Sequence, residues 1–136
     1  MSVKFTNNAE TTLASGINSS VTSLTVASSS GFPTITTGEY FYVTLDDGTN
    51  NEIVKVTAVS GTTWTIVRAQ DNTTARSFSS TNKVEVRVTA GLITDAVADA
   101  LASSFAKNAF TGDGTETDFT LSQSPNSKDD LIVFIE

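Results

Sequence analysis

The sequence has no cysteine and no histidine, and these two absences exclude much catalytic chemistry. Zinc sites of the usual kinds, Ser-His-Asp catalysis, Cys-His catalysis and disulfide frameworks all need at least one of these residues. Methionine and tryptophan occur once each, proline occurs twice, and charged residues make up only 17% of the chain. We therefore predict that the chain is not an enzyme and holds no metal ion or cofactor.

Positive charge is also scarce, because 8 Lys and Arg face 15 Asp and Glu and leave a net charge of -7. An acidic surface repels phosphate, so nucleic acids and anionic membranes are poor partners. No apolar run reaches the roughly 18 residues that a membrane-spanning helix needs. The first residues, MSVKFTNNAE, lack the apolar segment of a secretory signal. We expect no membrane span and no nucleic-acid partner.

Hydroxyl side chains are abundant, with 17 Ser and 23 Thr in 136 residues. This composition is typical of β structure, and the chain is long enough to bury a core without disulfides. Short alternating apolar segments separated by turn residues favour a small barrel or sandwich over a parallel sheet. The expected strands lie near residues 24–26, 39–45, 52–59, 63–68 and 84–88.

The order of these signals divides the chain into four parts. We predict a mainly β fold, with a small β-barrel or sandwich unit followed by one short amphipathic helix and the start of a second β unit. The last strand signal runs to Glu136 without a following turn, which predicts a truncated second unit. The parts are an N-terminal arm at 1–10, a β-rich domain at 11–90, a helix at 91–106 and the second β unit at 107–136.

The predicted helix carries apolar residues at helical spacing, with Asp95 and Asp99 on another face and an acid in its first turn. One interpretation is a helix packed on the sheet of its own chain. The other is a short coiled-coil seam between identical chains, because positions 93, 97, 100 and 104 step by 4, 3 and 4, although Ser104 weakens it. The candidate interface residues are Ile93, Val97, Ala100, Leu101 and Phe105.

Two acidic turns could hold a hard cation through oxygen ligands, although neither matches the calcium-loop pattern. The first contains Asp46, Asp47, Asn50 and Glu52. The second is the turn from Gly112 to Gly114, followed by Glu116 and Asp118. Solvated turns account better for both, and we predict no metal site.

Three aromatic residues, Tyr40, Tyr42 and Trp64, could form a stacking platform for a sugar. Aromatic residues on alternating strands more often belong to a core or to a subunit interface. Both interpretations remain open from the sequence.

Four segments form a recognisable series, namely Gly31-Phe32-Pro33, Glu52 to Val59, Gly61 to Arg68 and Asp71 to Phe78. Together they resemble a recurring module of tailed-phage virion proteins. A second stretch, Phe110 to Leu121 followed by Leu131 to Ile135, resembles a unit of phage tail fibres. The likeness covers roughly residues 20–136, and it departs at Ala69 and Asn72, where the module usually has Gly.

This resemblance implies a structural virion protein, the N-terminal attachment region of a phage tail fibre. Such a region anchors the fibre to the tail or baseplate, so its partners would be other tail or baseplate proteins. Fibre proteins are usually parallel homotrimers, which agrees with a helical seam at residues 91–106. The protein would be assembled in the host cytoplasm and reside in the virion tail. The alternatives are a capsid decoration or head-fibre protein and a host-glycan-binding module.

Overall fold

The computed structural model describes residues 2–104. The chain forms two compact units, residues 1–99 and residues 100–136, and of the second only residues 100–104 are described. The predicted second β unit, the turn from Gly112 to Gly114 and the candidate interface residue Phe105 therefore lie outside the described residues.

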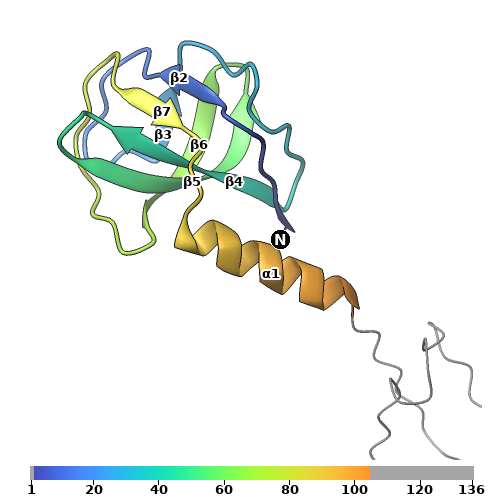
Figure 1. Cartoon of the computed structure of the whole chain (residues 1–136). Coiled ribbons are helices and arrows are strands. Elements are labelled where there is room, and N and C mark those ends of the chain that lie inside the picture. The colour runs from blue at the N-terminus through green and yellow to red at the C-terminus, as the bar shows by residue number, and fades with distance from the viewer. Residues whose placement is uncertain (1, 105–136) are drawn as a thin grey trace, which may run out of the picture. The chain divides into compact units, whose positions relative to one another are not determined.

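The first unit is mainly β and leads into one short helix, which confirms the predicted fold class (Figure 1). All five expected strands are present, whereas the two strands nearest the N-terminus carry no clear signal in the sequence. The strands are β1 (Ser2–Val3), β2 (Glu10–Thr12), β3 (Ser23–Thr25), β4 (Glu39–Asp46), β5 (Asn51–Ser60), β6 (Thr63–Gln70) and β7 (Lys83–Glu85), and the helix is α1 (Ala90–Ser104).

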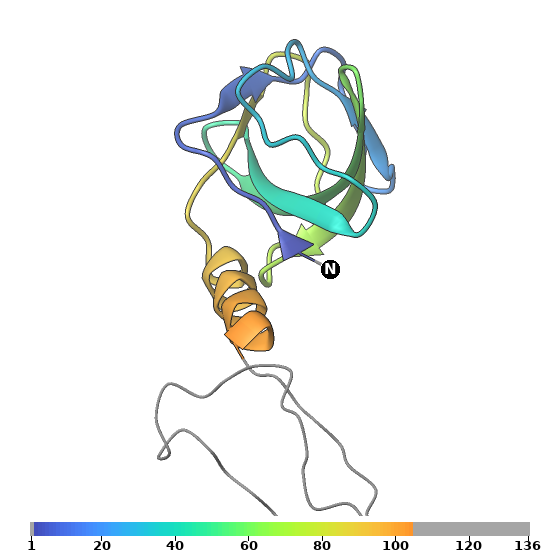
Figure 2. The ribbon, with the colours of Figure 1, turned by 90° about the vertical axis from the view of Figure 1, so that its right-hand side faces the viewer.

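The strands form a single curled sheet in the order β2-β7-β4-β5-β6-β3, with β1 paired to β4 outside this path. Neighbours on the path are antiparallel, and β1 runs parallel to β4. The sheet curls into a half-barrel, as Figure 2 shows. A bridge between Leu13 and Val26, which directly follow β2 and β3, joins its two outer strands.

The hydrophobic core lies inside the curled sheet and is centred on the indole of Trp64. This ring meets the rings of Phe32 and Phe41 edge-on, with centroid distances of 4.9 and 5.5 Å. Its Nε1 donates a hydrogen bond of 2.9 Å to the hydroxyl of Ser29, so its polar atom is satisfied. The other buried apolar residues are Leu13, Leu24, Val26, Val43, Leu45, Val54, Val56, Ile66, Phe78 and Val84.

Strand β4 is buried on both faces, which its alternating pattern does not predict. Phe41 points into the core, as alternation requires. On the opposite face, Tyr40 and Tyr42 are only 5% and 6% exposed, because Leu92 and Ala96 of α1 cover them. This outer face of β4 is where the helix meets the sheet.

Strand β7 is shorter than the alternation of three valines predicts. Val84 is in the core and the N–H of Val86 still donates to a backbone carbonyl, but Val88 is 80% exposed. The edge of β4 is shared, because β7 pairs with Thr44 to Asp46 and β1 pairs with Glu39 and Tyr40. The chain therefore leaves the sheet after Glu85 and turns toward α1.

One ion pair lies buried beside the core and ties the long loop after β6 to the sheet. Glu52 is fully buried and accepts bonds of 2.8 and 2.7 Å from Nε and Nη2 of Arg68. The N–H groups of Ala69 and Arg76 also donate to it. Burial by itself would raise the pKa of Glu52, but the guanidinium and these N–H groups outweigh it and lower the pKa.

The end of β6 and the turn that follows it have an unusual backbone at the two positions where the sequence departs from the phage module. Ala69 and Asn72 have φ angles of 54° and 60°, in the left-handed region that glycine adopts readily. The turn therefore keeps a glycine-like conformation without glycine. Asn tolerates this region better than other residues, whereas Ala pays a steric penalty there.

The N-terminal residues run along the edge of β4. Val3 is buried, and the N–H of Lys4 donates a 2.7 Å hydrogen bond to the carbonyl of Tyr40. The Nζ of Lys4 pairs with Glu39 at 2.9 Å, and this contact helps to lower the pKa of Glu39 to about 2. Residues 2–4 thus occupy the part of the β4 edge that β7 leaves open.

Candidate functional site

Helix α1 begins at a polar cap that includes an acid from a distant loop. Thr89 accepts a hydrogen bond from the N–H of Leu92, and Asp71 accepts one of 2.8 Å from the N–H of Gly91. A Cβ at position 91 would overlap the Asp71 carboxylate, so this contact requires glycine. The prediction of an acid in the first turn is wrong, since the first turn has none and Asp71 supplies the negative charge from outside.

One face of α1 packs on the outer face of β4 and β5 through a small mixed cluster. Leu92 is 8% exposed and lies with Val3, Tyr40 and Tyr42, and Ala96 packs against the same group. Figure 1 shows the helix running beside the sheet rather than over its open end. The first interpretation of the helix, packing on its own sheet, therefore holds for this face.

The carboxylates of this face bind the sheet directly. The hydroxyls of Tyr40 and Tyr42 both donate to Oδ2 of Asp95, at 2.6 and 2.8 Å. One turn later, Oδ2 of Asp99 accepts a 2.8 Å hydrogen bond from the backbone N–H of Val3. Three donors from two separate strands thus converge on two acids of the helix.

The groups around this contact shift the pKa values of its three side chains. The Tyr40 hydroxyl, with help from Tyr42 and nearby Lys55, lowers the pKa of Asp95. Burial and the adjacent Asp95 carboxylate raise the pKa of both tyrosines. The Nζ of Lys55 lies 4.4 Å from the ring centre of Tyr40 and 5.5 Å from that of Tyr42. Asp95 is therefore held in its charged form beside a cation and two donors.

The opposite side of α1 carries the residues that the sequence singles out as an interface. The side chains of Ile93, Val97 and Leu101 are 54%, 54% and 51% exposed. They follow one another at every fourth residue, which places them along one side of the helix. Ala100 is also on an exposed part of the helix, and Phe105 lies outside the described residues. These positions are compatible with the predicted interface, and the interface itself stays a prediction.

The structure does not bring the first acidic turn together as a cation site. Asp46 binds the guanidinium of Arg87, and Asp47 accepts hydrogen bonds from the N–H groups of Thr49 and Asn50. Glu52 is buried in its own ion pair on the inner side of the sheet. Within residues 2–104, no group of three or more acidic side chains could hold a metal ion. This turn is the hydrogen-bonded hairpin turn that the sequence favours.

The three aromatic residues of the possible sugar platform are all buried. Trp64 is 0% exposed in the core, whereas Tyr40 and Tyr42 lie under α1 on the other face of the sheet. The structure therefore places these residues in buried clusters, as the core interpretation predicts, and not in a surface platform. Each ring is already packed, and their polar atoms are bonded to Ser29 or to Asp95.

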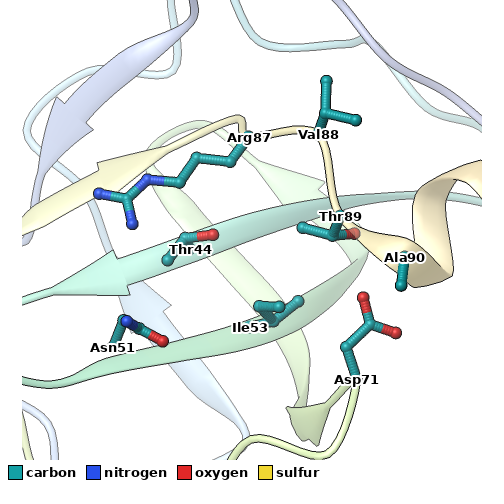
Figure 3. Close-up of a pocket in the computed structure, with 8 residues that line it drawn as sticks. All are labelled: Thr44, Asn51, Ile53, Asp71, Arg87, Val88, Thr89 and Ala90. Carbon is teal, nitrogen blue, oxygen red and sulfur yellow. The ribbon is translucent and has the colours of Figure 1, made fainter.

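A shallow depression lies where the chain passes from β7 to α1 (Figure 3). The charged groups at its rim are already engaged, because Arg87 binds both Asp46 and Glu85 and Asp71 binds the helix start. In Figure 3 the side chain of Val88 points away from it. The lining residues are Thr44, Asn51, Ile53, Asp71, Arg87, Val88, Thr89 and Ala90. We assign no chemistry to this depression.

The sequence reasoning missed three acids that place the helix, namely Asp71, Asp95 and Asp99. A signal was present for two of them, because Asp95 and Asp99 are one turn apart on the side of the helix away from Ile93 and Val97. This spacing places both acids on one side of the helix, but it does not tell whether that side meets the sheet or solvent. Asp71 carries no comparable local signal.

Comparisons with known proteins add no identification. No helix in the described part of the chain is long and apolar enough to span a membrane. No protein-family model matches the sequence, and no curated protein matches it.

Proposed function

We propose that this chain is a structural, non-enzymatic module that holds a trimeric tail fibre of a tailed bacteriophage on the tail or baseplate. The observation that carries the proposal is that the two faces of α1 have different surroundings. One face of the helix packs on its own sheet, and the other leaves Ile93, Val97 and Leu101 exposed. In the proposed trimer, this exposed face meets the same face of two other copies.

The charge distribution on α1 favours contact between copies. Each chain carries a net charge of -7, so identical chains repel one another at long range. The helix has two charged residues, Asp95 and Asp99, and both are turned toward their own sheet. The exposed side is neutral, and burying a large apolar side chain there is worth about 1.5–3 kcal/mol. Three helices can therefore approach along this side without bringing like charges together.

The motifs shared with phage virion modules have definite structural roles in this fold. Phe32 of the Gly-Phe-Pro segment packs on the core indole, Glu52 and Arg68 form the buried ion pair, and Asp71 caps α1. The resemblance thus rests on residues that build the sheet and join it to the helix. This supports the assignment of the same module type, and with it the proposed location in a virion.

The trimer is tested by light scattering on the full chain at micromolar concentration. We expect three times the mass of one chain. Val97→Asp places a charge on the exposed side and should give monomers. Ala98→Asp is the matched control, because it adds the same charge one residue away on a part of the helix outside the proposed seam.

A wild-type chain that stays monomeric over the whole concentration range would contradict the trimer. Equal dissociation by Val97→Asp and Ala98→Asp would show that charge, rather than position, governs assembly.

The location is tested by electron microscopy of labelled virions. The proposal expects label at the tail or baseplate. Label spread over the capsid faces would favour a capsid decoration or head-fibre protein and would overturn the tail assignment. Since the trimer and the location are measured separately, each can fail without the other.

A further inference from the structure

Helix α1 is turned about its own axis so that some of its large apolar side chains face away from the sheet. Ile93 and Val97 are 54% exposed, while the side facing the sheet presents Leu92, the small Ala96 and two acids. Turning the helix so that Ile93 and Val97 face the sheet would bury more apolar surface, which is the usual arrangement of a surface helix. Something other than apolar contact therefore selects the observed rotation.

Hydrogen bonds to Asp95 are one cause of the observed rotation of the helix. A single carboxylate oxygen receives both tyrosine hydroxyls, at 2.6 and 2.8 Å. Tyr40 and Tyr42 are 5% and 6% exposed, so a rotated helix would leave two buried hydroxyls without this acceptor. Hydrogen bonds to a charged acceptor are about twice as strong as neutral ones, and unmade buried ones are costly.

Asp99 supplies a second fixed point one turn along the helix. Its Oδ2 binds the N–H of Val3, a backbone group of β1 that is itself paired with the edge of β4. Two anchors, one on the tyrosines and one on the backbone of β1, fix both the rotation of the helix and its position along its axis. A helix held at a single point could still turn or slide.

We propose that Asp95 and Asp99 are positioning residues that turn the apolar side of α1 away from its own sheet and present it to other copies of this chain. The inference rests on the proposed trimer for its consequence, since the same contacts would then set how each sheet is oriented around the trimer axis. The geometry of the contacts within one chain carries the rotation itself.

The test uses the full chain, which has no native cysteine, so the reagent labels the introduced cysteine alone. Ala96→Cys places a thiol on the side facing the sheet, and Ala98→Cys, the matched control, places one at an exposed position outside the proposed seam. The rate of labelling by a soluble thiol reagent is measured for both cysteine variants. Each is measured with Asp95 and Asp99 native and again with Asp95→Ala and Asp99→Ala combined. Circular dichroism on the same samples reports whether the helix persists.

We expect slow labelling of Ala96→Cys and fast labelling of Ala98→Cys when the acids are native. With both acids changed to alanine, labelling at position 96 should rise several-fold, while that at position 98 stays fast. Asp95→Asn with Asp99→Asn should restore slow labelling, because the amide oxygen accepts the same hydrogen bonds. Tyr40→Phe with Tyr42→Phe leaves the helix sequence intact and should also speed labelling at position 96.

Unchanged slow labelling at position 96 in both the alanine and the phenylalanine variants would overturn the inference. Light scattering on the same samples decides the trimer separately, because labelling within one chain does not depend on the number of copies. Slow native labelling with a rise in the variants supports the positioning role in a monomer as well as in a trimer.

Discussion

The curled sheet and helix α1 are stabilised by different means. The sheet surrounds a contiguous apolar core and an ion pair whose carboxylate, Glu52, is fully buried. The helix is attached by one small cluster and by hydrogen bonds to Asp71, Asp95 and Asp99. Its apolar residues are divided, because Leu92 faces the sheet whereas Ile93, Val97 and Leu101 are about half exposed.

In the proposed trimer this difference gives the two regions different tasks. A contiguous buried core stabilises each chain from within. An exposed apolar side of a helix gains free energy when another surface covers it. The proposal therefore expects the sheet to set the stability of one chain and the helix to set the contact between chains, and substitutions should separate the two properties.

The largest expected effect lies in the buried ion pair of the sheet. Glu52→Gln removes one charge and leaves the Arg68 guanidinium buried without a counter-ion. We expect a loss of about 3–5 kcal/mol in the free energy of unfolding, measured by urea denaturation. Glu10→Gln is the control, because Glu10 is exposed at an outer strand. A loss of similar size in both variants would show that the burial of Glu52 is not what matters.

A pair of identical substitutions compares the two regions directly. Val54→Ala opens a cavity in the core, where Val54 is 0% exposed, and should cost about 2–3 kcal/mol of unfolding free energy. Val97→Ala removes the same atoms from the exposed side of α1. It should change the free energy of unfolding of the dilute monomer by no more than about 0.5 kcal/mol. It should nevertheless weaken the trimer.

Denaturation at low concentration and light scattering at high concentration separate these effects. If Val97→Ala destabilised the dilute chain as much as Val54→Ala, the exposed side of the helix would belong to the core of the monomer.

A smaller effect of opposite sign is expected at the end of β6. Ala69→Gly should raise the free energy of unfolding by about 1 kcal/mol, because Ala69 has a φ of 54° that costs a residue with a Cβ about that much. Ala58→Gly is the control in the extended backbone of β5, where glycine should lower stability by about 0.5–1 kcal/mol. Thermal unfolding of both variants measures the two changes in stability, which should have opposite signs.

The fold could be predicted largely because its signals are local. Alternating segments predicted five strands, and all five are present. The strand expected at 84–88 ends at Glu85 instead, because β1 occupies part of the β4 edge that a longer β7 would need. Such competition between distant segments leaves no mark on a local pattern.

The candidate site could be predicted only in part for the same reason. Helical spacing groups Ile93 with Val97, and separates both from Asp95, but it does not say which side meets the sheet. That choice depends on Tyr40 and Tyr42, which lie 55 and 53 residues before Asp95 in the chain. Hydrophobicity by itself would select the wrong side. The two interpretations of the helix do not exclude each other, because packing on the sheet uses one face and the proposed seam uses the other.

The smallest expected effect is a pH dependence that belongs to the helix contact. The pKa of Asp95 is lowered in the folded chain, first by the Tyr40 hydroxyl. A lowered pKa adds stability that is fully present above the unfolded value of about 3.9 and is lost as the pH falls through the folded value. Asp95→Asn lacks this titration, so its unfolding free energy should fall less steeply below about pH 4.

Urea denaturation from neutral pH down to the acid limit measures this slope, and the gap between the two curves should stay below about 1 kcal/mol. Tyr40→Phe with Tyr42→Phe should flatten the curve in the same way, because it removes the donors that lower the pKa of Asp95. Combining these changes with Asp95→Asn should add little, since all act on one contact. Parallel curves for Asp95→Asn and wild type would mean that the acid-sensitive stability resides in the sheet, where Glu52 also has a lowered pKa.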